Sequence, residues 1–392
     1  MKNNLEIAKD YFLNTYNRYP LVIDHGKGVY LYDDEGKEYL DFAAGIAVCA
    51  LGYGNKTYNE ALKAQIDQLL HTSNYFFNEP SILAAKKLAL ASGMERVFFT
   101  NSGTEAVEGA IKLARKYYYK KTGSAEGEII AMNHSFHGRS MGALAVTGQP
   151  KYQKEFGPMI PNIKFANFND LDSVKAQVTK KTCAILVETI QGEGGLYPAS
   201  EEFIKGLRAL CDDLDVLLIL DEIQCGMGRT GAMFAYQSYG ILPDVMTSAK
   251  ALGCGVPVGA FAARGKAAWV LEPGDHGTTY GFNPLAGTAV CTVFDLFDDL
   301  NLVAHAKEMG IYLEEKLEEL VADYEFVIGH RGKGLMQGLE LDRPVGEYIV
   351  KAQEKGLIII TAGANLIRLV PPLVIEKEHI NQMVEILKEC FR

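Results

Sequence analysis

The sequence of 392 residues lacks long apolar runs, and its longest uncharged apolar stretch covers only residues 42–52. A membrane-spanning helix needs about 18 or more consecutive apolar residues. Charged residues at Lys2, Glu6 and Lys9 interrupt the first twenty positions, which leaves no apolar core for a signal peptide. We therefore expect no membrane-spanning segment and no export, and we expect a cytoplasmic location.

Positive charge is also in short supply. The chain has 39 Lys and Arg residues against 49 Asp and Glu residues, a net charge of −10. Binding to nucleic acid draws most of its affinity from basic groups that neutralise phosphates. The composition therefore argues against a nucleic-acid partner and favours a small-molecule ligand.

Cysteine is present without a metal-binding or disulfide pattern. There are seven cysteines, an odd number, and no two of them form a Cys-x-x-Cys pair. A chain of this length does not depend on disulfides to complete its core. We predict reduced thiols and no metal site.

The sequence does contain enough apolar residues, 48% of the total, for two or three domains at about 150 residues each. Short apolar runs alternate with amphipathic stretches. The runs are residues 97–99, 129–132, 184–187 and 216–220. Near-continuous apolar runs are typical of parallel strands that are covered on both faces. We predict an α/β core with a parallel sheet and crossover helices.

The pattern changes after Pro284. A helix is predicted from there to about Asp299, a second helix carries Leu313 and Leu317, and a last helix begins near Lys377. We predict three parts. They are an N-terminal segment of residues 1–55 that packs with a small domain, a large ligand-binding domain of residues 56–284, and a small C-terminal α+β domain of residues 285–392.

Polar residues follow the first of the apolar runs. Ser102, Gly103 and Thr104 open the next helical stretch, where free backbone N–H groups, two hydroxyls and the helix dipole could bind a phosphate. The alternative is structural, because Ser102 and Glu105 have the spacing of a capping box.

Asp221 follows the most apolar run, so a carboxylate is expected at the end of a buried strand. Such a charge is costly unless it is paired. A structural alternative is that Asp221 caps the next turn or meets an arginine. Residues 226–231 then read Gly-x-Gly-x-x-Gly, but they neither follow the strand directly nor open a helix. We therefore do not interpret them as a dinucleotide-binding motif.

Lys250 lies in an apolar stretch whose nearest acidic residue is Asp244. A single lysine in such a sequence could extend its amine to solvent. The alternative is a desolvated amine with a lowered pKa, which condenses readily with an aldehyde.

Together these three features fit one ligand. Pyridoxal 5′-phosphate (PLP) carries a phosphate, a ring nitrogen that can be protonated, and an aldehyde. Asp221 would keep the ring nitrogen protonated so that the ring accepts electrons from a deprotonated carbon. Lys250 would hold the aldehyde and move the proton.

The sequence resembles the class III (subgroup II) aminotransferases of PLP fold type I over nearly its whole length. The stretches that carry the resemblance are Gly26–Gly28, Asp33–Phe42, Phe99–Tyr117, Ser135–Arg139, Val187–Gly195, Leu220–Gly231, Ala249–Gly259, His276–Tyr280 and Arg368–Pro372. The resemblance implies a large domain with a mostly parallel sheet and a smaller α+β domain formed by the C-terminal part with the N-terminal segment.

The resemblance also implies roles around the cofactor. Ser102, Gly103 and Thr104 would hold the phosphate. Phe136 would stack on one face of the ring, Ile223 would press on the other, and Gln224 would lie near the phenolic oxygen. Thr279 would reach the phosphate of a partner subunit, so a homodimer with shared active sites is expected.

Substrate recognition is implied for two arginines, whose planar guanidinium groups bind carboxylates in a bidentate way. Arg139 would bind the carboxylate far from the reacting amine, and Arg368 the α-carboxylate of glutamate. Glu193 would pair with Arg368 when no α-carboxylate is bound. Tyr16 matches a family position near the pocket.

Ile46 bears on the choice of donor. Relatives that use ornithine usually have a tyrosine there, which can meet a free α-amino group, whereas isoleucine suits an acylated nitrogen. The resemblance thus implies transfer of the δ-amino group of N2-acetylornithine to 2-oxoglutarate, in arginine biosynthesis.

Several alternatives stay open at this stage. Related donors are ornithine, succinylornithine, succinyl-diaminopimelate and 4-aminobutyrate. Two other classes are a nucleotide-dependent oxidoreductase and a PLP-binding protein without catalysis. The sequence departs from the family pattern at Tyr53, and at Cys254 and Phe282, where glycine is common.

Overall fold

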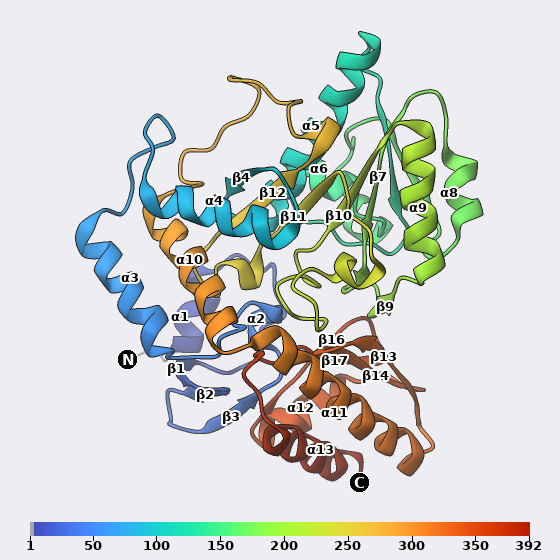
Figure 1. The fold of residues 1–392 in the computed structure, drawn as a ribbon. Coiled ribbons are helices and arrows are strands. Elements are labelled where there is room, and N and C mark those ends of the chain that lie inside the picture. The colour runs from blue at the N-terminus through green and yellow to red at the C-terminus, as the bar shows by residue number, and fades with distance from the viewer. Residues whose placement is uncertain (1–3) are drawn as a thin grey trace.

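The computed structural model describes residues 4–392 and is built around a seven-stranded sheet (Figure 1). In spatial order the strands are β4 (Arg96–Thr100), β12 (Gly259–Ala263), β11 (Val245–Ser248), β10 (Leu217–Asp221), β7 (Thr182–Glu188), β5 (Glu128–Met132) and β6 (Ile163–Ala166). Only β12 runs antiparallel to its neighbours. All four apolar runs lie in this sheet, which confirms the predicted α/β core with a mostly parallel sheet.

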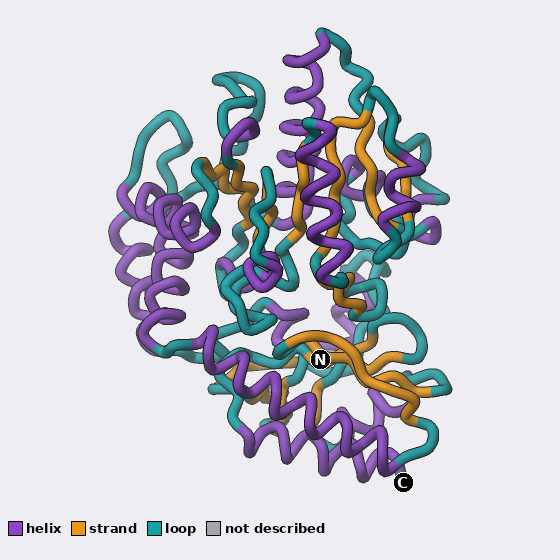
Figure 2. Tube along the Cα trace, turned by 45° about the vertical axis from the view of Figure 1, so that its right-hand side comes forward, coloured by secondary structure: helices purple, strands orange, loops and turns teal. Residues whose placement is uncertain are grey.

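Helices cover both faces of the sheet (Figure 2). In β10, Leu217 and Ile219 belong to the core beneath α5 (Gly103–Thr122). Their neighbours Leu218 and Leu220 belong to the core that includes the apolar side of α9 (Glu201–Leu214). Successive strand side chains point to opposite faces, so a strand covered on both sides must be apolar throughout.

Two four-stranded sheets lie on the other side of the molecule. One contains β1 (Ile23–Lys27), β2 (Tyr30–Asp33), β3 (Glu38–Asp41) and β15 (Leu357–Ile358); the other contains β13 (Val327–Lys333), β14 (Met336–Leu341), β17 (Leu366–Leu369) and β16 (Ile360–Thr361). Strand β15 pairs in parallel with β3, so the N-terminal strands share a sheet with the C-terminal part. The exact domain boundaries stay a prediction.

The remaining elements connect these sheets. They are α1 (Asn4–Tyr11), α2 (Ala44–Ala47), α3 (Lys56–Gln68), α4 (Glu79–Ser92), α6 (Met141–Ala145), α7 (Pro150–Gln153), α8 (Leu171–Gln177), β8 (Ile190–Gln191), β9 (Tyr197–Pro198), α10 (Pro284–Asp299), α11 (Leu302–Asp323), α12 (Gly346–Glu354) and α13 (Lys377–Phe391). The long helices predicted after Pro284 are α10, α11 and α13. Among residues 4–392, the helices are all too short or too polar to cross a bilayer.

Some turns require a positive φ at residues other than glycine. In α2, Ala44, Ile46 and Ala47 have φ values of 47°, 66° and 62°, a conformation that costs roughly 1–2 kcal/mol per non-glycine residue. Cys254 and Phe282 have φ values of 50° and 72°. Both are positions where the family pattern has glycine, which adopts this conformation without strain.

The glycine stretch 226–231 forms turns and does not begin an α-helix. This agrees with the prediction that these glycines are not a dinucleotide-binding motif. Glu222 binds the backbone that directly follows this loop. Its carboxyl group accepts hydrogen bonds from the backbone N–H of Ala235 at 2.7 Å and of Tyr236 at 3.2 Å. The buried side chain of Arg229 donates to the carbonyl oxygens of Leu335 and Pro371, which ties the loop to the C-terminal part.

Glu222 is 1% exposed, and burial raises its pKa to about 8. The folded protein therefore keeps a proton that the unfolded chain loses near pH 4.5, so this group stabilises the fold at low pH and the contribution is lost as pH rises toward 8. We expect Glu222→Gln to remove this dependence. Between pH 5 and 8 the stability of the variant should rise relative to wild type by roughly 2–4 kcal/mol, measured by urea unfolding.

Glu347→Gln is the matched control. This exposed carboxylate pairs with Lys351, which lowers its pKa, so its titration lies below the tested range. Parallel stability curves for wild type and Glu222→Gln would show that Glu222 does not hold the proton.

Candidate functional site

A cavity of about 390 Å³ lies at the carboxyl ends of β4, β7, β10 and β11. It is lined by Val48, Asn101, Ser102, Gly103, Thr104, Phe136, His137, Gly138, Arg139, Glu188, Ile190, Asp221, Ile223, Gln224, Cys225, Ala249, Lys250, Gly255, Val256, Pro257 and Val258. This edge is where open parallel sheets bind ligands. The polar stretches that follow three separate apolar runs thus meet at one cavity.

The first wall is the N-terminus of α5. Ser102 caps this helix, with its Oγ accepting the N–H of Glu105 at 3.3 Å. The Glu105 carboxylate accepts the backbone N–H of Asn101 at 2.7 Å, one residue before the partner expected in a capping box. The cap and an anion site are compatible, because Gly103 and Thr104 both line the cavity in the first turn, where N–H groups have no partner within the helix.

Gly103 also meets a steric requirement. A Cβ atom at this position would lie 2.9 Å from Cδ1 of Ile223. The absence of a side chain therefore lets the start of α5 approach the turn that follows β10.

The hydroxyl of Thr104 points into a chain of hydrogen bonds. The Oγ atoms of Thr104 and Ser140 are 2.6 Å apart, and Ser140 donates to Oε1 of Glu108 at 2.6 Å. Because the one hydroxyl proton of Ser140 goes to Glu108, the proton between Thr104 and Ser140 must come from Thr104. Thr104 therefore offers the cavity its backbone N–H, and a contact of its hydroxyl with a phosphate stays a prediction.

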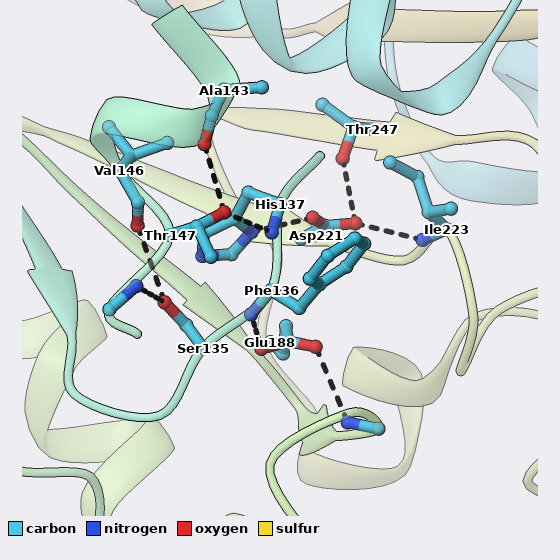
Figure 3. Close-up of polar contacts among 12 residues, drawn as sticks. Ser135, Phe136, His137, Ala143, Val146, Thr147, Glu188, Asp221, Ile223 and Thr247 are labelled. Atoms are coloured by element: carbon cyan, nitrogen blue, oxygen red, sulfur yellow. Dashed lines mark hydrogen bonds and ion pairs between the residues drawn. The ribbon is translucent and has the colours of Figure 1, made fainter. Parts of the chain in front are cut away.

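Asp221 forms the second wall. It is 4% exposed, and its carboxylate accepts the N–H of Ile223 at 3.0 Å and the hydroxyl of Thr247 at 3.1 Å (Figure 3). Its other oxygen lies 2.7 Å from Nδ1 of His137. Asp221 does cap the next turn, which is one of the structural roles that the sequence allowed. Its ion-pair partner, however, is a histidine and not an arginine.

His137 is a site residue that the sequence analysis missed. It is fully buried, and burial lowers its pKa, but the hydrogen bond and charge of Asp221 outweigh this effect and raise the pKa above its usual value. Its Nε2 has no partner among the residues that the structure describes. A signal was present, because a carboxylate predicted at a buried strand end needs a partner and His137 adjoins Phe136 in a family stretch.

Glu188 lies at the end of β7, directly across from Asp221 in the strand pairing. It accepts the N–H of Phe136 at 3.1 Å and of Gly192 at 3.3 Å (Figure 3). Burial raises the pKa of Glu188 to about 8. Glu188 therefore fixes the backbone that carries Phe136 and His137.

The third wall is Lys250, immediately beyond β11. It lines the cavity and does not extend over the outer surface. The alternative in which the amine of Lys250 extends to solvent therefore does not apply. Burial lowers its pKa to about 8, although the Glu193 carboxylate opposes the shift. A substantial fraction of its amine is thus neutral and nucleophilic near neutral pH.

Charged side chains lie at the far end of the site. Arg368 on β17 is 3% exposed and forms an ion pair with Glu193 through Nη1; the same nitrogen lies 3.3 Å from Oε1 of Gln224. Arg139 lines the cavity, and its guanidinium carbon is 3.9 Å from the ring centre of Tyr152 and 5.3 Å from that of Phe136.

Besides Arg368 and Glu193, which reach the lining through the contact of Arg368 with Gln224, three predicted site residues lie outside the lining of this cavity. Tyr16 is 70% exposed and contacts Arg18, and Ile46 is 44% exposed beside Val48. Thr279 lines a second cavity of about 760 Å³ together with Ser73. The roles of these three residues stay predictions.

The family model for Aminotransferase class-III matches residues 11–391. The chain belongs to the class-III aminotransferases. It is 46% identical over 390 residues to the acetylornithine aminotransferase of Methanocaldococcus jannaschii, covering 100% of this chain and 98% of that protein.

Solved structures of other aminotransferases have the same fold. The ornithine aminotransferase of Toxoplasma gondii superposes with a TM-score of 0.95 at 31% identity, covering 99% of this chain and 94% of that one. The N-acetylornithine aminotransferase of Stenotrophomonas maltophilia gives a TM-score of 0.85 at 33% identity, covering 98% of both chains.

The lowered pKa of Lys250 can be measured directly. Because burial favours the neutral amine, we expect labelling of Lys250 by trace reductive methylation to be half-maximal near pH 8. Lys355 is the internal control, since its hydrogen bond to Glu389 raises its pKa and favours the charged form. Peptide mass spectrometry across a pH series reads both; equal midpoints for the two lysines would contradict the assignment.

Proposed function

We propose that this class-III aminotransferase uses PLP to transfer the δ-amino group of N2-acetylornithine to 2-oxoglutarate, giving N-acetylglutamate 5-semialdehyde and glutamate. The observation that carries the proposal is the meeting of three groups at one cavity. They are the first-turn N–H groups of α5, the buried carboxylate of Asp221, and the amine of Lys250 with its lowered pKa. The 46% identity to an acetylornithine aminotransferase supports the choice of reaction.

These residues fit PLP. The backbone N–H groups of Gly103 and Thr104, together with Ser102, would hold the phosphate. Asp221 would accept a hydrogen bond from the ring nitrogen, and the amine of Lys250 would condense with the aldehyde. When bound, PLP supplies an electron sink for the carbon from which a proton is removed.

Side chains around the ring complete the fit. Phe136 and Ile223 would pack against its two faces, and Gln224 would lie near its phenolic oxygen. His137 would act through Asp221, because its hydrogen bond fixes the orientation of that buried carboxylate, and the same contact raises the pKa of His137.

Lys250 has a second role. Its neutral amine would take the proton from the carbon that bears the donor's reacting amine and return it on the cofactor side. A pKa near 8 suits both directions, since the amine can gain and lose a proton near neutral pH.

Glu193 and Arg368 let one site serve two donors. Glutamate brings an α-carboxylate to its reacting carbon, whereas the reacting carbon of acetylornithine carries only hydrogen. Arg368 would bind that carboxylate in the first case and Glu193 in the second, so its buried charge is always paired. Arg139 would bind the distal carboxylate of both donors.

The donor's acyl group is the finer part of the proposal. Ile46 offers no hydrogen bond to a free α-amino group, which favours an acylated donor, and the resulting product belongs to arginine biosynthesis. The alternative is a related donor, namely ornithine, succinylornithine, succinyl-diaminopimelate or 4-aminobutyrate.

We also propose a homodimer in the cytoplasm. Tyr75 and Phe77 are 95% and 93% exposed, and Tyr75 lines the second cavity together with Thr279. A second copy of the chain would cover these aromatic side chains and bring Thr279 to the partner's phosphate. All seven cysteines are free thiols, which suits a reducing compartment.

The function is tested with a panel of amine donors and 2-oxoglutarate as acceptor. We expect acetylornithine to be the best donor, and Lys250→Ala to lower turnover by at least about 10³-fold because it removes both nucleophile and proton carrier. The variant should stay folded and bind PLP without a covalent bond, since α5 and Asp221 remain. Lys355→Ala, at an exposed ion pair, is the control.

Three results would contradict parts of this proposal. Activity in Lys250→Ala would remove Lys250 from the reaction. The absence of a borohydride-stable mass adduct on Lys250 would contradict its covalent role toward PLP, and a bound cofactor without turnover of any donor would favour a non-catalytic binder.

Glu193→Ala tests the exchange of partners at Arg368. The acetylornithine half-reaction should slow by about tenfold or more, because a hydrogen bond to a charged group is worth about 1.5–3 kcal/mol. The glutamate half-reaction should keep its rate or gain, because its carboxylate no longer competes with Glu193. Single-turnover rates measured separately for the two donors give the answer.

Asp295→Ala is the control, since Asp295 on α10 pairs with Lys87 on α4 at 2.5 Å and neither residue contacts the loop of Glu193 or lines the cavity. If Glu193→Ala slows both half-reactions equally, or slows only glutamate, Glu193 does not exchange with substrate.

A further inference from the structure

The turn Ala44–Ala47 is held in an unusual backbone conformation next to the proposed donor site. Its four consecutive residues have φ values of 47°, 63°, 66° and 62°, and only Gly45 is a glycine. Residues with a Cβ keep this conformation only where the surroundings impose it, and such strain is often found at functional sites.

The carboxylate of Asp41 imposes the conformation. Asp41 is fully buried at the end of β3. Its Oδ1 accepts the N–H of Ala43 at 2.8 Å, and its Oδ2 accepts the N–H of Ala44 at 3.0 Å. The first N–H groups of the turn are thereby satisfied by one side chain.

Tyr53 fixes that carboxylate from the other side. Its hydroxyl donates to Oδ2 of Asp41 at 2.5 Å. The Asp41 carboxylate thus accepts three hydrogen bonds, two from backbone N–H groups at the turn and one from Tyr53. The bond from Tyr53 fixes the carboxylate in the orientation that the two N–H groups require. Tyr53 is also a position where this sequence departs from the family pattern.

The turn is anchored close to the cavity. Val48, which follows it directly, lines the cavity with Lys250. The N–H of Phe42 donates to Ile358 and its carbonyl oxygen accepts from Val370, both at 2.8 Å, and Val370 is two residues beyond Arg368. The position of the turn therefore sets where Ile46 and Val48 stand relative to the site.

We propose that Asp41 and Tyr53 are positioning residues for the amine donor: they hold the left-handed turn so that Ile46 and Val48 face the acylated end of an N-acyl diamino acid. This inference rests on the proposed function. It predicts selectivity between donors, because glutamate has no acyl group and its two carboxylates are assigned to Arg139 and Arg368.

The test compares two tyrosines whose hydroxyls donate to an aspartate, in the PLP-loaded enzyme. Tyr53→Phe removes the hydroxyl that fixes Asp41. Tyr39→Phe is the matched control, since its hydroxyl donates to Asp33 at 2.8 Å in the sheet that contains Asp41; Tyr39 is buried and Tyr53 is half-buried. The substrate dependence of single-turnover rates gives an apparent dissociation constant for each donor.

We expect Tyr53→Phe to raise the apparent dissociation constant for acetylornithine by three- to tenfold and to leave that for glutamate within twofold. Tyr39→Phe should change neither. Ile46→Ala supplies a second route, because Ile46 is 44% exposed and its truncation leaves Asp41 and Tyr53 untouched. It should produce the same selective loss.

Two outcomes overturn the inference. One is an equal loss for both donors in Tyr53→Phe and Ile46→Ala, which marks a general structural role. The other is a Tyr53→Phe enzyme whose two constants both match those of wild type. A wild-type enzyme that turns over no amine donor contradicts the proposed function itself, whereas normal wild-type turnover with an unchanged ratio contradicts only the positioning role.

Discussion

The carboxylate of Asp221 is buried and has to be satisfied by hydrogen-bond donors inside the protein, and much of the site follows from that requirement. Strand pairing places Glu188 on one side of Asp221 and Thr247 on the other. Thr247 gives Asp221 a hydrogen bond, and Glu188 holds the backbone that brings His137 to it. Three strand ends and one loop are therefore arranged around a single buried charge, which would otherwise be strongly destabilising.

Features set by local pattern were predictable from the sequence. The apolar runs identified the central strands because a strand covered on both faces has to be apolar at every position. Three features of the site were also predictable: the capped start of α5, the carboxylate at the end of β10 and the lysine after β11. Each follows a strand of the central sheet, and the carboxyl ends of parallel strands share one edge. Their assembly at one cavity followed from topology.

Features that depend on contacts between distant segments were not predictable. His137 is 84 positions from Asp221 in the chain. The Thr104 hydroxyl donates to Ser140 because the Ser140 hydroxyl donates to Glu108. The spacing of apolar residues is also an incomplete guide to burial. Leu69 and Leu70 continue the apolar spacing of α3, but they lie beyond its last residue and are 44% and 49% exposed.

The hydrogen-bond chain from Thr104 through Ser140 to Glu108 has a consequence for substrate length. Glu108 also accepts the N–H groups of Gly142 and Ala143, and a Cβ on Gly138 would lie 2.3 Å from Oγ1 of Thr104. The backbone around Arg139 and the start of α5 are thus one rigid unit. In the proposed function these two segments bind the distal carboxylate of the donor and the cofactor phosphate. A fixed spacing between them would confine adaptation to longer or shorter substrates to the opposite wall.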